Sequence, residues 1–591
     1  MIEPRIYRAA FVPALFAVVL VMFSLESRPR PLPQGLAADV LFEGEQAAAE
    51  ARRIATEHPD RAAGTTGDRA VADEVGDALR ASGFAVERQR FDHHGDELVN
   101  VIGRRAGRSR RQVVVIAARD AVGAPDAAGS AADTAALIEI ARVFEGRPSR
   151  KTLILASVDG SALGDVGTVR LLDEIDGPDL VDGVLVVSGL GAGPGEPAAI
   201  VPWSNDTTRA GIGLQRTAAE SLREELEPPG ASASPAGQLA RMAFPLGIGG
   251  QGVLLAEGYD AVRIAGDGEL SDSPAGTPVD EDRLGALGRA TLRTVTALDQ
   301  GPRPERGPRT YVTMAGQVMP GWVLAVLAGT LILPALAAGV DAFARARRRR
   351  APVGPWLLWI AAGLAPFALG FGLANLLDLF GATPEPPPAP VAPSLYPLDG
   401  PAVAVLAVVL VAVALSWVAL RRFAGPTTRR LDEAPGSGAG VAVALALGVA
   451  ALALWLIDPF AALVAVPAVH CWMLATLIDP PPARRVRFGL IAAGLVLPLL
   501  LAVYQLFVLG LDPLAGAWYL LLLVLGGQIG IASVAVAALF AAVLASVVTI
   551  SRRSRDASGA PGGEPVTPTT RGPLSYAGPG SLGGTDSALR R

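Results

Sequence analysis

The chain has 591 residues, of which 51% are hydrophobic, and a mean hydropathy of +0.40. It is too long for a single domain and too apolar for a wholly soluble protein. The formal net charge is −5, and the single cysteine, Cys471, excludes an intrachain disulfide framework and a cysteine-cluster metal site.

The chain begins with a hydrophobic run over residues 9–25, close to the minimum length for crossing a bilayer. Arg5 and Arg8 precede this run, and no small-x-small cleavage motif follows it. We therefore predict an uncleaved signal anchor, followed by a short proline-rich linker, over residues 1–35. A cleaved signal peptide is the alternative.

Residues 36–300 have the pattern of a soluble α/β domain. Short apolar runs without polar alternation predict strands at 99–103, 112–117, 152–157 and 184–188. Helical patterns cover residues 43–57, 68–81, 134–144 and 165–174. Continuous apolar strands that alternate with helices are typical of a sheet covered on both faces. We predict a three-layer domain with a mostly parallel sheet.

A linker over residues 301–317 precedes a predicted transmembrane domain of seven spans at residues 318–551. We place the spans at 319–340, 356–379, 402–420, 438–457, 461–478, 488–511 and 518–550. The last is too long for one upright helix, so it is either tilted or begins as an interfacial segment broken near Gly526 and Gly527. With the anchor, the all-α membrane domain has about eight helices. The Gly/Pro/Ser/Thr-rich tail, residues 552–591, is expected to be disordered and cytoplasmic.

Arginines determine the predicted orientation. They cluster after the second, fourth, sixth and eighth spans, at residues 345–350, 421–430, 484–487 and 552–555, whereas the intervening loops 381–400, 458–460 and 512–517 contain no Lys or Arg. The positive-inside rule places the arginine loops in the cytoplasm. We expect a multi-pass protein of the cell membrane, with domain 36–300 outside and both termini cytoplasmic.

Six segments of the outer domain occur in the order of one known family: Arg61-Ala62-Ala63-Gly64, Ala81-Ser82-Gly83-Phe84, Asn100-Val101-Ile102-Gly103, a helix at 134–142, and stretches at 258–264 and 273–278. In these segments the chain resembles the co-catalytic di-zinc aminopeptidases, the family of the secreted bacterial leucine aminopeptidases. The resemblance covers residues 43–299. It implies a zinc-exopeptidase-like fold and, in an active member, two zinc ions and a glutamate base.

The resemblance also locates the positions where such an enzyme would hold its metals. The ligand positions fall on Ala118, Gly129, Asp159, Ser188 and Asp272, and the general-base position falls on Val158. A methyl group or a glycine cannot bind zinc, and valine cannot take a proton from water. We therefore expect no catalytic residue, no metal ligand and no cofactor, with zinc only if the family chemistry survives.

Four carboxylates remain as weak candidates for a rearranged site, namely Asp120, Asp126, Asp159 and Asp272. An all-carboxylate set suits Mg²⁺, Ca²⁺ or Mn²⁺ better than zinc. Asp120 is interpreted as a solvated or capping residue, and Asp126 becomes a bridging ligand only if residues are inserted before the helix at 134.

The histidines do not indicate a metal site or a proton relay. His93 and His94 are interpreted as a surface pair, because no family ligand lies there. His470 falls within a predicted span without an acidic partner in the membrane, which argues against a proton relay.

The leading hypothesis is a membrane-anchored pseudo-peptidase whose outer domain is a binding or scaffolding module at the cell surface. The alternatives are an active membrane metallo-exopeptidase with a rearranged site, and a transporter with a regulatory outer domain. Expected partners are the lipid bilayer and a peptide or another membrane protein. We expect no nucleic acid.

Overall fold

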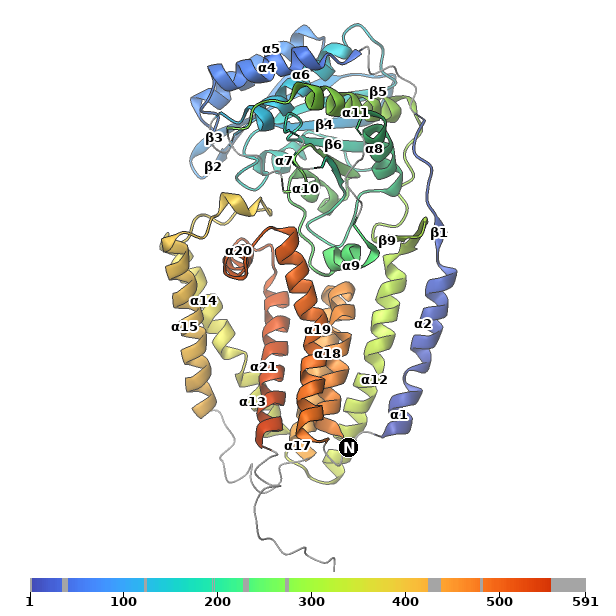
Figure 1. Cartoon of the computed structure of the whole chain (residues 1–591), viewed down its shortest axis with the longest axis vertical. Helices are drawn as coiled ribbons and strands as arrows, with labels where there is room; N and C mark the ends of the chain where they lie inside the picture. Colours follow the sequence, from blue (N-terminus) through green and yellow to red (C-terminus); the bar gives the residue numbers. More distant parts are fainter. Residues whose placement is uncertain are drawn as a thin grey trace, which may run out of the picture.

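The structure is a computed structural model that describes residues 3–33, 41–121, 125–193, 195, 197–226, 233–270, 276–423, 437–478 and 482–553. Asp272 and the predicted tail beyond residue 553 lie outside the described residues. An α/β domain stands on a bundle of long apolar helices, and the start of the chain lies at the far end of that bundle (Figure 1).

A seven-stranded sheet forms the centre of the α/β domain, in the order β2-β3-β5-β4-β6-β8-β7. The pairings β5–β4, β4–β6 and β6–β8 are parallel, and those of β2–β3, β3–β5 and β7–β8 are antiparallel. The sheet is thus mixed: three of its six pairings are parallel, whereas a mostly parallel sheet was expected. The strands are β2 (Ala85–His93), β3 (Asp96–Arg105), β4 (Ser109–Ala118), β5 (Lys151–Val158), β6 (Val181–Ser188), β7 (Ala199–Val201) and β8 (Ala261–Ala265).

Helices lie on both sides of this sheet (Figure 1). One side carries α4 (Gly44–Glu57), α5 (Thr66–Ala81), α6 (Ala132–Val143), α8 (Ile212–Glu225) and α11 (Glu281–Gln300). The other side, toward the bundle, carries α7 (Val166–Leu171) and α10 (Gly250–Ala256). The central strands are buried almost throughout because both faces are covered, which explains their continuous apolar sequence.

The segment predicted as a linker, residues 301–317, is folded against the α/β domain. Arg303 and Arg306 each donate a hydrogen bond to the carbonyl oxygen of Pro178, at 2.9 and 3.0 Å. The segment then contains β9 (Tyr311–Met314) and the beginning of β10 (Gln317–Pro320). β10 pairs with β9 and with β1 (Glu26–Ser27), so the chain enters and leaves the bundle through one small sheet.

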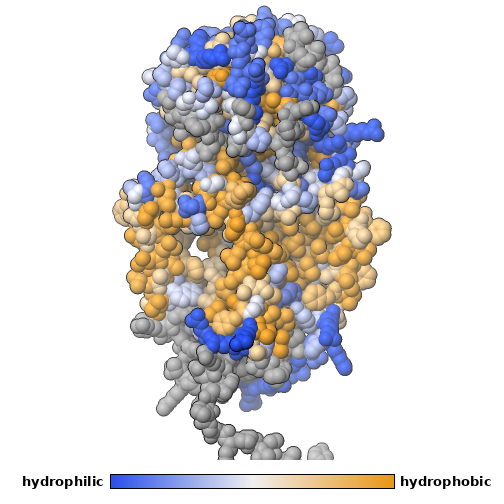
Figure 2. Space-filling model, viewed as in Figure 1, coloured by the Kyte–Doolittle hydropathy of each residue, from blue (hydrophilic) through white to orange (hydrophobic). Residues whose placement is uncertain are grey.

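Eight stretches of the described chain are long and apolar enough to cross a membrane, including Pro4–Phe23 near the N-terminus. The bundle contains α1 (Pro4–Ala9), α2 (Val12–Phe23), α12 (Gly321–Arg348), α13 (Gly354–Ala362), α14 (Ala365–Leu379), α15 (Gly400–Phe423), α17 (Ser437–Ile457), α18 (Pro459–Leu477), α19 (Arg484–Val508), α20 (Pro513–Leu525) and α21 (Ile531–Arg553). Hydrophobic side chains cover the visible face of this part (Figure 2). The chain is therefore a membrane protein of several spans with an α/β domain at one end.

The stretch predicted at 518–550 is two helices. α20 is a short apolar helix at the end of the bundle nearest the α/β domain, and α21 crosses the bundle (Figure 1). The break falls between Leu525 and Ile531, where Gly527 adopts a φ of 75° that disfavours a continued helix. The predicted interruption near Gly526 and Gly527 is confirmed, and the alternative of one tilted helix is wrong.

His470 joins the first helix to the rest of the bundle. Its Nε2 donates to the carbonyl oxygen of Leu331 at 2.8 Å, so its Nδ1 is the acceptor for the Tyr7 hydroxyl, also at 2.8 Å. Both ring nitrogens are thus used in packing α18 against α12 and α1. Hydrogen bonds between helices therefore account for this histidine within an apolar span.

Candidate functional site

A large pocket, with a volume of about 580 Å³, lies at the carboxyl ends of the parallel strands. Open α/β sheets commonly place their sites there, because loops of different strands meet at this edge. Its walls come from the ends of β4, β6 and β8 and the loops that follow them. A fourth wall comes from the membrane part, at residues Val391, Ala392, Ser394 and Leu395.

The predicted metal-ligand positions separate into two groups. Ala118, Gly129 and Ser188 line the pocket. Val158 is buried in the core, and Asp159 lies behind the pocket wall with its Oδ2 3.5 Å from Nη2 of Arg119. Asp272 lies outside the described residues. Three of the six predicted positions therefore line one pocket, whereas Val158 and Asp159 do not.

Asp120 and Asp126, the predicted weak candidates that reach the pocket, both brace loops. Asp120 accepts hydrogen bonds from the backbone N–H groups of Ser161 and Ala162, at 3.0 and 3.2 Å. Burial raises its pKa. Asp126 accepts from the backbone N–H and the hydroxyl of Ser130, at 2.9 and 2.7 Å.

Two carboxylates fill the spaces that a side chain would need at Gly129, a predicted ligand position, and at Gly189, the residue after the predicted position Ser188. A Cβ atom added at Gly129 would lie 2.3 Å from Oδ1 of Asp126. A Cβ atom added at Gly189, next to Ser188, would lie 2.4 Å from Oδ1 of Asp267. A carboxyl group is therefore present at both places, but it belongs to another residue.

Asp133 and Asp165 are pocket residues that sequence reasoning missed. Asp133 accepts from the backbone N–H groups of Gly189 and Leu190, both at 2.9 Å, yet burial raises its pKa well above the ordinary value. Asp165 is 7% exposed, and its carboxylate has no hydrogen-bond partner within the described part of the chain. Burial, and then the charge of Asp120, raise the pKa of Asp165 to about 7.

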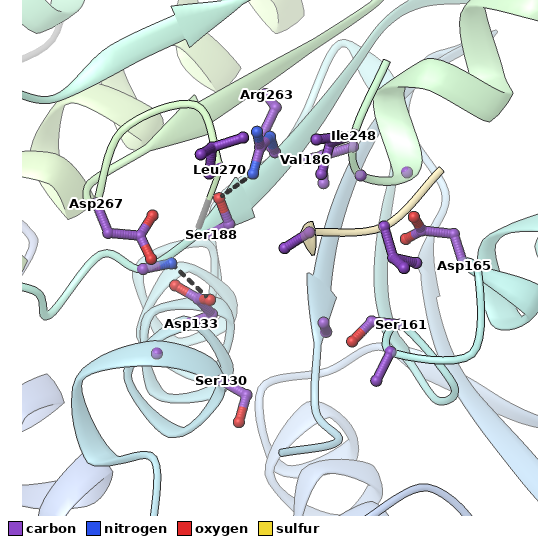
Figure 3. Close-up of a pocket in the computed structure, with 18 of the residues that line it drawn as sticks. Ser130, Asp133, Ser161, Asp165, Val186, Ser188, Ile248, Arg263, Asp267 and Leu270 are labelled. Atoms are coloured by element: carbon purple, nitrogen blue, oxygen red, sulfur yellow. Dashed lines mark hydrogen bonds between the residues drawn. The ribbon is translucent and has the colours of Figure 1, made fainter. Parts of the chain in front are cut away.

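Arg263 places a positive charge among these carboxylates. The residue is 2% exposed, and its guanidinium donates to the Ser188 hydroxyl at 3.1 Å (Figure 3). It also donates to the carbonyl oxygen of Glu269. Although burial lowers its pKa, Asp267, Glu269, Asp165 and Asp133 act in the opposite direction. In the sequence, this residue could have been recognised as the one charged side chain in the otherwise apolar strand β8.

The loop over residues 380–399, between α14 and α15, closes one side of the pocket. The Tyr519 hydroxyl of α20 donates to the carbonyl oxygen of Val391 at 2.7 Å. Pro388 packs so closely on Gly164 that a Cβ there would lie 2.5 Å from the proline Cδ. The pocket is therefore shared between the α/β domain and the membrane part.

No protein-family model matches the chain, and no curated protein matches it. Solved structures with a similar fold include a zinc aminopeptidase from Bacillus subtilis, 13% identical, over 45% of this chain and 95% of that one, with a TM-score of 0.35. The aminopeptidase LapA of Legionella pneumophila is 11% identical over 45% and 73% of the chains, with a TM-score of 0.38. A glutaminyl cyclase of Porphyromonas gingivalis is 16% identical over 43% and 98%, with a TM-score of 0.33. At such scores, the chemistry of the pocket has to be inferred from its own residues.

Proposed function

We propose that this chain is a membrane-anchored, peptidase-like protein whose outer domain binds or scaffolds a partner and does not hydrolyse peptides. The observation that carries the proposal is the composition of the pocket at the ends of the parallel strands. Ala118 and Gly129 offer no ligand atom, and the hydroxyl of Ser188 is engaged by Arg263. Among the described residues that line the pocket there is no histidine.

Zinc does not fit this set of donors. Protein zinc sites use histidine nitrogen and cysteine sulfur, with carboxylates as additional ligands, and their geometry is nearly tetrahedral. Here the buried guanidinium of Arg263 supplies positive charge where a metal would supply it. A divalent cation added beside a permanently charged guanidinium would be repelled, and the low dielectric of a buried site strengthens that repulsion.

The shape of the pocket supports a binding role. Apolar side chains such as Val186, Ile248, Leu270 and Leu395 line it together with carboxylates and hydroxyls. A concave surface with apolar walls and a few polar groups is the usual form of a ligand site. A peptide segment or part of another membrane protein fits this chemistry.

A rearranged carboxylate site remains the second candidate, because Asp126 and Asp267 occupy the spaces beside Gly129 and Gly189. Of the four carboxylates predicted for such a site, Asp120 and Asp126 line the pocket, whereas Asp159 faces Arg119. The site would take Mg²⁺ or Mn²⁺ rather than zinc. Arg263 opposes it for the reason given above.

The two candidates differ in what Arg263 does. If its guanidinium takes the place of a metal, the full-length protein in detergent should bind Mn²⁺ weakly or not at all at the pocket. The variant Arg263→Met should then bind Mn²⁺ at least tenfold more tightly, as removal of a nearby buried positive charge requires. Mn²⁺ titration followed by electron paramagnetic resonance measures this, with Arg289→Met, whose guanidinium bonds Glu225 away from the pocket, as the control. Tight Mn²⁺ binding by the native chain, lost in Asp126→Asn, would favour the rearranged site.

A further inference from the structure

A second group of polar side chains lies away from the large pocket, at the tip of the β2–β3 hairpin. His93 pairs with Asp96 across the hairpin, and His94 and Gly95 form the two-residue turn, both with positive φ. Such turns need positive φ at both central residues, and histidine tolerates it better than most side chains. The turn brings the two rings together, with centroids 4.4 Å apart. Two of the chain's four histidines therefore lie side by side.

The membrane part supplies a carboxylate to this pair. Glu385 belongs to loop 380–399, and its Oε1 lies 2.5 Å from Nε2 of His94. One ligand atom from each of His93, His94 and Glu385 can be chosen so that all three lie within 4.8 Å of one another. The predicted surface pair thus lies where the α/β domain meets loop 380–399. The side chains of His94 and Glu385 are still 63% and 58% exposed.

A cavity of about 550 Å³ adjoins the three side chains, and Asp378 and Thr383 also line it. Two imidazoles and one carboxylate are a zinc-type donor set that leaves a fourth position for water. Imidazole nitrogen disfavours Ca²⁺ and Mg²⁺, which select oxygen ligands. Ligand atoms of tetrahedral zinc lie about 3.3 Å apart, so small rotations of the two exposed side chains are sufficient.

The only other such group among the described residues shows what distinguishes this one. Glu57, His58 and Glu74 also lie together, but Arg53 pairs with both carboxylates at 2.7 Å. A metal there would have to displace a guanidinium from each of them. Within the described part of the chain, no lysine or arginine pairs with Glu385.

We propose that His93, His94 and Glu385 bind one zinc ion that joins the α/β domain to loop 380–399 of the membrane part. The same loop continues to Val391–Leu395, which close one side of the large pocket. The ion fixes the loop on its hairpin side, while Tyr519 fixes it on the side of α20. Zinc thereby holds in place the loop segment that lines the large pocket.

The test is titration of full-length protein, purified without a polyhistidine tag, with ZnCl₂ against a competing chromophoric chelator. We expect one zinc per chain, and an affinity lowered at least tenfold in His93→Ala/His94→Ala, since two of three protein ligands are lost. His58→Ala is the matched control and should bind as the native chain does. Absence of stoichiometric binding, or equal affinity in the double variant, would overturn the site.

A second arm tests the bridge between the two parts. Glu385→Gln keeps the size of the side chain but removes the charge, so zinc affinity should also fall at least tenfold. X-ray absorption should report two imidazole nitrogens at about 2.0–2.1 Å in the native chain. If Glu385→Gln binds zinc as tightly as the native chain, the ion sits on the hairpin alone and the bridging role is wrong. Thermal unfolding without zinc confirms that each variant is folded.

Discussion

Arg119 illustrates how single residues hold the edge of the sheet beside the pocket. Its Nε and Nη2 donate to the two carboxylate oxygens of Asp68, at 2.9 and 2.7 Å, and Nη2 also donates to the carbonyl oxygen of Val99 at 2.7 Å. Both side chains of the pair are fully buried. A charge in such a place is tolerated only while its partner is present, because water cannot replace that partner.

Removal of the Asp68 carboxylate should therefore destabilise the folded chain strongly. We expect Asp68→Ala to lower the free energy of unfolding by about 3–5 kcal/mol, since it leaves Arg119 buried and undercompensated. Denaturant unfolding of the full chain, followed at the α/β domain, measures the loss. Asp77→Ala breaks the exposed pair with Arg80 and should cost less than about 1 kcal/mol. Similar losses in the two variants would contradict the role given to burial.

Asp165 gives a prediction for pH dependence. Its pKa is raised to about 7 in the folded chain, mainly by burial, above the ordinary value of 3.8. The folded state therefore binds a proton that the unfolded state releases, and stability falls as pH rises from 3.8 toward 7. Asp165→Asn should raise the unfolding temperature at about pH 8 and flatten the slope toward pH 5.

A control with the opposite sign is available in Asp182. Burial raises its pKa, but hydrogen bonds from Arg111 and Lys151 outweigh burial and lower it. Its contribution to stability is present above the ordinary carboxyl pKa and is lost in acid, so Asp182→Asn should destabilise the chain at about pH 8. Destabilisation by Asp165→Asn at that pH would refute the assignment of an unpaired buried carboxylate.

At the residue scale, the sequence was sufficient where a position follows a strand directly. Ala118 and Ser188 end β4 and β6, and their register fixes which edge of the sheet they reach. It gave Asp126 only as a weak candidate that depended on an insertion before the helix at 134, and it did not identify Asp267, whose side chain lies beside Gly189. Loop conformation has no periodicity, so no sequence pattern could place the side chains of these two residues.

Among the elements, loop 380–399 has the most direct bearing on the pocket. Its proline-rich sequence was predicted only as an outer loop without Lys or Arg, yet it packs between the α/β domain and α20 (Figure 1). Gly164, with φ of 87°, lies against Pro388 and Ala389. The position of loop 380–399 therefore depends on the absence of a side chain at Gly164.

A methyl group at Gly164 should therefore loosen the loop. We expect Gly164→Ala to increase the rate at which a maleimide labels a cysteine placed at the buried Val391, in a Cys471→Ala background. The control is Gly146→Ala, which also has a positive φ, at 65°, but no atom within 4 Å of the added carbon. Equal labelling rates in the two variants would show that the loop does not rest on Gly164.

Helices with a clear hydrophobic periodicity were predicted well. Elements whose structure depends on contacts with other segments were not. The helix predicted at 134–144 is α6, and the break at Gly526 and Gly527 separates α20 from α21. The helix predicted at 165–174 is shorter, Val166–Leu171. β2 was missed because edge strands with mixed exposure lack a continuous apolar run.

For the whole molecule, the arginines give the orientation that we propose. Arg345 at the end of α12 lies 3.7 Å from Glu3, so the N-terminus and the first arginine cluster share the end of the bundle opposite the α/β domain (Figure 1). On the positive-inside rule, we propose that this end is cytoplasmic.

Accessibility in intact cells tests this orientation. A cysteine introduced at the exposed Ser394 should react with a membrane-impermeant maleimide, whereas one at the exposed Arg347 should react only after permeabilisation. Protease is a weaker probe of the linker than its composition implies, because Arg303 and Arg306 bond it to the domain. Labelling of the position-347 cysteine in intact cells, with protection at 394, would reverse the topology.

The central claim is that the pocket binds without hydrolysing. Its most direct test is an assay of the full-length protein, in detergent and with added zinc or manganese, for release of amino-terminal residues from a panel of peptides. If the resemblance assigns the base position to Val158 and ligand positions to Ala118 and Gly129 correctly, the pocket lacks the groups that activate water, and we predict no release above the rate without protein. Chelator-sensitive release that disappears in Asp126→Asn or Asp267→Asn would contradict the account and establish a rearranged enzyme.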